Sequence, residues 1–100
     1  MLQSFFLSKI RIKLLRLFIK NPTRKYYLRE ISKILDEPLT PIRRELINLK
    51  KVGFLKRRRE AHLLCYSVNP QFLLFHELKG MIEKAETVER ELVHTSVDDV

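Results

Sequence analysis

The densest positive charge in the chain is a run of four basic residues, Lys56 to Arg59, with His62 shortly after it. Beside a phosphate backbone, such a run gives affinity that is independent of base sequence and falls with salt. The alternative is that some of these charges only protect a sheet edge from strand addition. Because side chains alternate along a strand, Arg57 and Arg59 share one face and Arg58 takes the other. We therefore expect about half of the cations to contact nucleic acid.

A second set of polar residues precedes this run, on one side of a predicted helix. If Ile42 faces inward at 3.6 residues per turn, four side chains fall on the opposite side and a fifth lies at its flank. The four are Thr40, Arg44, Asn48 and Lys51, and the fifth is Arg43. Arginine can bridge guanine O6 and N7, and asparagine can pair with adenine in the major groove. The alternative is a solvated helix face, but the basic run just downstream favours nucleic-acid binding.

Residues suited to catalysis or metal binding are few and scattered. The histidines have no metal-ligand spacing with Cys65, and the chain has no glycine-rich phosphate loop. A lone cysteine in an alternating strand is more often a small packed or surface residue than a nucleophile. We therefore expect no enzymatic activity, no cofactor and no bound metal. The single cysteine also excludes an internal disulfide, which fits a reducing cytoplasm.

The charge is unevenly distributed over a chain of 100 residues, a length that allows one domain. Residues 1–70 carry 17 Lys and Arg against 5 Asp and Glu, which gives +12, whereas residues 71–100 carry 3 against 7, which gives −4. A basic body with an acidic C-terminal arm indicates one surface for a polyanion and another element with a different role. Cations interrupt every apolar run in the first 20 residues, so we expect neither a signal peptide nor a membrane span.

Hydrophobic spacing and turn residues predict a mainly α protein with a small β-hairpin, an α+β fold. The predicted helices run from Ser4 or Ser8 to Lys20, from Leu28 to Leu35, from between Pro38 and Pro41 to about Val52, and from Gln71 to about Leu92. The predicted strands are Lys25–Tyr27, Phe54–Glu60 and Leu63–Asn69. Thr40 and Pro41 fit the cap and first residue of the third helix. Gly53 fits its left-handed end.

The last predicted helix contains an apolar heptad pattern. Its apolar residues are spaced 4, 3, 4, 3 and 4 apart: Leu74, Leu78, Met81, Ala85, Val88 and Leu92. This seam favours a homodimer; the alternative is that Leu74 and Leu78 pack on their own domain. Gly80 lies inside the seam and weakens the helix by roughly 1 kcal/mol. We therefore expect a DNA-binding domain over 1–70, a dimerisation helix over 71–93 and a frayed tail over 94–100.

Residues 5–86 resemble a known family of regulators. The segments LREISKIL, IRRELINLKKVGFLKRRRE and CYSVNP resemble the winged helix-turn-helix domain of ArsR-like bacterial and archaeal regulators. The segments SKIRIKLLRLFIKNP and FHELKGMIEKAE are similar to a subgroup that often precedes a nucleotidyltransferase domain. The resemblance implies that the third helix enters the major groove and that the hairpin tip lies over the minor groove or backbone. The residues implicated by position are Thr40, Arg43, Arg44, Asn48, Arg57, Arg58, Arg59 and His62.

Two features depart from that family. The paired-cysteine motif of its metal-sensing branch has no match in this chain, so the resemblance does not imply a metal response. Ala61 stands where the hairpin tip usually has glycine. A left-handed turn there would cost alanine about 1 kcal/mol or more, so we expect a shorter or differently turned hairpin.

The leading hypothesis is a small dimeric transcriptional regulator that binds double-stranded DNA, with the first and last helices forming the dimer as the resemblance implies. The alternative is a protein-interaction module, for example one that pairs with a separate nucleotidyltransferase through the acidic last helix. RNA binding is a third hypothesis, in which Tyr26 and Tyr27 stack on bases, although these tyrosines also fit a core.

Overall fold

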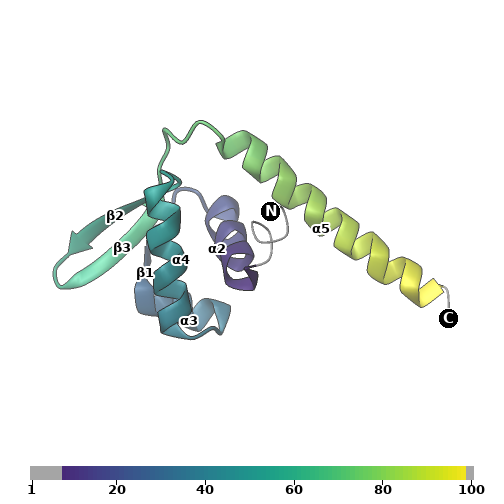
Figure 1. Ribbon diagram of the computed structural model, residues 1–100, viewed down its shortest axis with the longest axis horizontal. Coiled ribbons are helices and arrows are strands. Elements are labelled where there is room, and N and C mark those ends of the chain that lie inside the picture. Colours follow the sequence, from purple (N-terminus) through teal and green to yellow (C-terminus); the bar gives the residue numbers. More distant parts are fainter. Residues whose placement is uncertain (1–7, 99–100) are drawn as a thin grey trace.

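The computed structural model describes the backbone of residues 8–98 and the side chains of residues 8–88. Its elements in chain order are α2 (Lys9–Lys20), β1 (Tyr26–Tyr27), α3 (Leu28–Leu35), α4 (Leu39–Lys51), β2 (Leu55–Glu60), β3 (Leu63–Val68) and α5 (Phe75–Asp98). This order confirms the predicted α+β fold. The hairpin of β2 and β3 projects from one end of the body and α5 from the other, so the molecule is elongated, 54 by 29 by 27 Å (Figure 1).

The core lies between the helices α2, α3 and α4 and one face of a three-stranded antiparallel sheet with the order β1-β3-β2. Its largest fully buried side chains are Tyr26, Tyr66, Phe18, Phe54, Leu14, Ile31, Ile42 and Leu46. The Phe18 ring packs edge-to-face on the rings of Tyr26 and Phe54, with ring centroids 5.3 Å and 6.5 Å apart. Tyr26 therefore fills the core, as the alternative to base stacking predicted, while Tyr27 is half exposed.

Helix α4 begins at Leu39, inside the predicted range from Pro38 to Pro41, but Thr40 does not cap it. The N-cap is Pro38, and the Ile42 N–H donates to the Pro38 carbonyl at 3.4 Å. Pro41 lies in the first turn in either arrangement, where its missing N–H costs nothing. Thr40 therefore lies within the helix and is exposed.

The end of α4 follows the prediction for Gly53, which has a φ of 90°. The Gly53 N–H donates to Lys50 O and the Phe54 N–H to Leu49 O, so the last carbonyls of the helix are satisfied. The Asn69 side chain donates to the Gly53 carbonyl at 3.0 Å and ties this turn to the end of β3. The turn thereby sets the direction in which β2 leaves α4.

The hairpin has a two-residue turn formed by Ala61 and His62, because Glu60 and Leu63 are direct cross-strand partners. Ala61 has a φ of 55°, and of these two residues it alone has a positive φ. A positive φ at the first central residue only is the pattern of a type II′ turn, which suits the twist of a hairpin. A shorter or differently turned hairpin was expected because a left-handed turn is costly for alanine, but Ala61 adopts the left-handed conformation.

The last helix differs from its predicted limits at both ends. It begins at Phe75 rather than Gln71, because Asn69 first forms a turn: its Oδ1 accepts from the Gln71 N–H and its carbonyl accepts from the Phe72 N–H. It continues to Asp98, through part of the tail expected to fray from residue 94. The sequence from Phe75 to Asp98 contains no proline that would end the helix earlier.

Candidate nucleic-acid interface

Helix α4 presents the predicted polar side chains on its outward surface. Its inward residues Ile42, Leu46 and Leu49 are buried, as their spacing predicted. The opposite side carries Thr40, Arg43, Arg44 and Lys51, all exposed, and the half-buried Asn48. These five side chains therefore lie on one accessible surface, which we call the reader surface.

Sequence reasoning missed one member of this surface. Ile47 lies one turn from Arg43, Arg44 and Lys51 and is 36% exposed. An apolar side chain among donors can contact a thymine methyl group in the major groove. The helical periodicity that selected Arg44 and Lys51 also selects Ile47, but the predicted set contained polar side chains alone.

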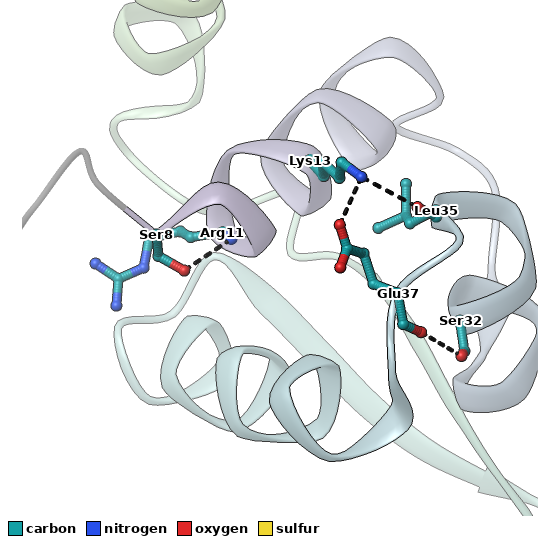
Figure 2. Close-up of polar contacts among 6 residues, drawn as sticks. All are labelled: Ser8, Arg11, Lys13, Ser32, Leu35 and Glu37. Atoms are coloured by element: carbon teal, nitrogen blue, oxygen red, sulfur yellow. Dashed lines mark hydrogen bonds and ion pairs between the residues drawn. The ribbon is translucent and has the colours of Figure 1, made fainter.

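The turn between α3 and α4 is held by hydrogen bonds from both sides (Figure 2). Asp36 adopts the left-handed conformation, and the Ser32 hydroxyl donates to the Glu37 carbonyl at 2.6 Å. From α2, Lys13 Nζ donates to the Leu35 carbonyl at 3.2 Å and to Glu37 Oε2 at 2.6 Å. The hydrogen bond from Lys13, together with its positive charge, lowers the pKa of the Glu37 carboxyl. The turn therefore fixes α4 against α3 and α2.

A second contact holds α4 on α2 along its length. Arg11 Nε donates to Glu45 Oε2 at 2.8 Å, and Arg11 Nη2 donates to Glu45 Oε1 at 3.4 Å. Two parallel bonds of this kind restrict orientation as well as distance. They join residues 34 positions apart, and they leave the reader surface on the far side of α4 unobstructed.

The hairpin separates its arginines between two faces, as alternation predicted. Arg57 and Arg59 are directly opposite Tyr66 and Leu64, so they share the face that packs on the helices. Both are exposed, on the edge strand β2 of the sheet. Arg58 is opposite Cys65 on the outer face. His62 is exposed at the tip.

Glu60 anchors the strand β1 to the hairpin near its tip. Its carboxylate accepts from Lys25 Nζ at 2.8 Å and from the Tyr27 hydroxyl at 3.3 Å. The hydrogen bond from Lys25 lowers the pKa of Glu60, and the same bond raises the pKa of Lys25. Cys65 is buried beneath this cluster, and its burial raises the pKa of its thiol. It is thus a packed, neutral residue.

Ion pairs divide the cations of the body into two groups. Every described ion pair uses a cation from α2 or from the segment that leads into β1, and its partners are Glu45, Glu37, Glu86, Glu30 and Glu60. In contrast, the cations of α4 and β2 form no ion pair within the described part of the chain and are all exposed. They are Arg43, Arg44, Lys50, Lys51, Lys56, Arg57, Arg58 and Arg59. Eight cations without an ion pair therefore lie on α4 and β2, which is more than on any other pair of consecutive elements in the described chain.

The predicted heptad seam of α5 is divided by the structure. Leu78 is half-buried and packs on the core next to the buried Ile82, which the heptad did not include. Leu74, Met81, Ala85 and Val88 are exposed. Leu92 lies outside the residues whose side chains are described. Met81, Ala85 and Val88 of α5, with Leu74 just before it, are therefore the exposed apolar seam residues that a partner could cover.

Two other kinds of feature are absent from the described residues. No group of three or more His, Cys, Asp or Glu side chains in that part could hold a metal ion. None of the helices described there is long and apolar enough to cross a membrane.

Comparison with solved structures identifies the architecture. HlyU from Vibrio cholerae N16961 matches with a TM-score of 0.61 at 22% identity, over 87% of this chain and 86% of that chain. MepR, a transcription regulator of the Staphylococcus aureus multidrug efflux pump MepA, matches with a TM-score of 0.67 at 14% identity, over 98% and 80%. The chain has the winged helix-turn-helix fold. Sso10a-2, a DNA-binding protein from Sulfolobus solfataricus, shares it with a TM-score of 0.65 at 18% identity, over 91% and 90%.

In this fold α3 and α4 are the helix-turn-helix, and β2 and β3 form the wing. No model of a known protein family matches the chain, and neither does any curated protein sequence. The structural similarity, at these identities, therefore concerns the fold.

Proposed function

We propose that the protein binds double-stranded DNA as a small dimeric transcriptional regulator, with α4 in the major groove and the wing on the backbone or minor groove. The observation that carries this proposal is the set of eight exposed cations on α4 and β2 without a carboxylate partner among the described residues. Clustered positive charge of this kind attracts a polyanion, and the phosphate backbone of DNA can neutralise it. The solved structures with this fold include proteins titled as a transcription regulator and a DNA-binding protein.

The reader surface supports sequence-specific binding. Arg44 can form two hydrogen bonds to guanine, Asn48 can form two to adenine, and Ile47 can contact a thymine methyl group. The rigid attachment of α4 through the Arg11–Glu45 pair and the α3–α4 turn supports the same conclusion, because base reading needs a fixed helix orientation. The wing cations Arg57, Arg58 and Arg59, with His62 at the tip, supply affinity that does not depend on base sequence.

The test is fluorescence anisotropy with a labelled duplex, first selected from a random pool by its binding to the protein. Arg44→Ala should weaken binding about tenfold or more, since one bidentate base contact is worth about 1–3 kcal/mol. Lys20→Ala is the matched control: it removes one exposed cation that is paired with Glu86 on the opposite side of the body. Affinity that is equal in Arg44→Ala, Lys20→Ala and the wild type would refute the proposed interface.

The exposed apolar residues of α5 support dimerisation through this helix. Met81 and Val88 are 47% and 52% exposed and lie on the same side, seven residues apart. Heptad spacing of this kind suits pairing with a second copy. A palindromic selected site would agree with it, because two-fold symmetry in the protein is mirrored in the DNA.

Light scattering at micromolar concentration tests this part separately. The wild type should have the mass of a dimer, and Met81→Lys with Val88→Lys should have the mass of a monomer. Glu83→Lys adds charge on another side of the same helix and should remain dimeric. A monomeric wild type without DNA affinity would instead support the protein-interaction alternative, in which α5 pairs with another protein such as a separate nucleotidyltransferase.

A further inference from the structure

The outer face of the wing sheet forms an open concavity of about 520 Å³ at the C-terminal end of α4. Lys50 lines it from α4, Lys56 and Arg58 from β2, Ser67 from β3, and Lys25 from the segment before β1. A cleft of about 300–1,000 Å³ is the usual size for a small-molecule site. We call this feature the wing concavity.

The wing concavity lies mostly on the hairpin, next to the reader surface of α4. Lys56 and Arg58 are directly opposite Ser67 and Cys65, so these four side chains share the sheet face that points away from the helices. On α4, Lys50 is rotated by about 100° from Lys51 but lies two turns from Arg43 on the same side, so the hollow borders the reader surface there. Arg59 lies on the opposite face of the sheet, whereas Arg57 lines the hollow together with Lys56 and Arg58 of the same strand.

The charge of the wing concavity is strongly one-sided. Five of its lining residues are lysine or arginine and none is a carboxylate. Lys25 is neutralised in part by Glu60 at 2.8 Å, but Lys50, Lys56 and Arg58 have no ion pair within the described residues. The buried Cys65 adds no negative charge, since burial raises the pKa of its thiol. Like charges gathered in a hollow attract an anion with several negative charges.

We propose that the wing concavity binds adjacent phosphoryl groups, with Lys50, Lys56 and Arg58 as the charge partners and the Ser67 hydroxyl as a further hydrogen-bond donor. Phosphoryl oxygens suit these donors because each accepts charge-assisted hydrogen bonds from ammonium and guanidinium groups. Two sources share this chemistry: a free oligophosphate, such as a nucleoside triphosphate, and consecutive phosphates of a nucleic-acid backbone. The free oligophosphate goes beyond the proposed function and does not need DNA binding by α4, whereas the backbone source rests on the proposed function, in which Arg58 already contacts phosphate.

The experiment is isothermal titration of the full chain with inorganic tripolyphosphate, in the absence of DNA. The wild type should bind with one saturable site per chain, and Lys56→Gln with Arg58→Gln should weaken binding about tenfold or more. Arg43→Gln with Arg44→Gln is the matched control, since it removes the same charge from the reader surface; it should stay within about twofold of the wild type. Absence of saturable binding by the wild type, or an equal loss in both double variants, would overturn the proposal.

A second variant keeps the test valid if the first one unfolds. Ser67→Glu places a negative charge inside the hollow without removing a cation, and it should also abolish tripolyphosphate binding; wild-type affinity in this variant would overturn the site. Addition of the selected duplex then separates the two sources. Exclusion of tripolyphosphate by the duplex identifies the DNA backbone as the natural occupant, and simultaneous binding of both identifies a free oligophosphate. If Arg44→Ala no longer binds DNA but still binds tripolyphosphate, the wing concavity is a binding site independent of the reader surface.

Discussion

Replacement of Ala61 by glycine should stabilise the protein. Ala61 has a φ of 55°, where an L-residue with a Cβ atom is strained by roughly 1–2 kcal/mol. Glycine removes that strain but gives the unfolded chain more conformational entropy, which costs about 0.4–1 kcal/mol. The net gain is therefore about 1 kcal/mol. For a domain of this size it corresponds to a rise of about 4–8 °C in the unfolding midpoint.

The assay is thermal unfolding followed by circular dichroism, at one protein concentration because dimerisation would make the midpoint depend on concentration. Gly53→Ala is the matched control: Gly53 has a φ of 90°, and a Cβ atom there would meet nothing within 4 Å. Its effect is thus backbone strain without a clash, and it should lower the midpoint. A midpoint that falls in Ala61→Gly, or that rises in Gly53→Ala, would refute the assignment of these turns.

Three further predictions follow from the wing, the core and the ion pairs. In anisotropy titrations, Arg57→Gln with Arg59→Gln should reduce the slope of log affinity against log salt concentration. The expected reduction is about 0.9 for each phosphate that these arginines neutralise. An unchanged slope would show that they do not contact the DNA backbone. Tyr26→Phe should leave the free energy of unfolding unchanged or raise it by about 1 kcal/mol, because the buried Tyr26 hydroxyl has no hydrogen-bond partner in the described structure; a clear decrease in urea unfolding would show that the hydroxyl is bonded. The pKa of Glu37 is lowered in the fold by its hydrogen bond from Lys13, so this carboxylate contributes stability above its ordinary pKa of 4.5, and the contribution is lost as pH falls through the lower folded value. The stability difference between the wild type and Glu37→Gln should therefore shrink on acidification below about pH 4.5, and a difference that grows there would contradict the sign of the shift.

Periodicity alone predicted the body of the fold well. The spacing of Ile42, Leu46 and Leu49 identified the inward side of α4, and alternation correctly divided Arg57 and Arg59 from Arg58. Both signals are local, because they depend only on the geometry of one helix or one strand. They fixed which side chains share a face.

Element boundaries were less accessible from the sequence because they depend on competing hydrogen bonds. The side chain and carbonyl of Asn69 delay the start of α5, and the backbone bond to Pro38 moves the start of α4 ahead of Thr40. Ala61 takes the left-handed conformation since the register of β2 and β3 requires a two-residue turn. In each case, a hydrogen bond or a strand pairing with another residue overrides the conformation that the local sequence favours.

Long-range contacts could not be read from the sequence at all. The Arg11–Glu45 pair joins residues 34 positions apart and the Lys25–Glu60 pair joins residues 35 apart. Such pairings show that four cations of α2 are neutralised, whereas those of α4 and β2 form no ion pair within the described residues. The wing concavity likewise exists only because the fold brings Lys25, Lys50 and Lys56 around one sheet face.

The most direct test of the central claim, that α4 and the wing form a DNA interface, is a nuclear magnetic resonance titration of the labelled protein with the selected duplex. Amide shifts should change most at residues 39–51 and 56–62, and added salt should reverse the changes at the wing. Shift changes confined to α5, or largest on the ion-paired surface of α2, would contradict it.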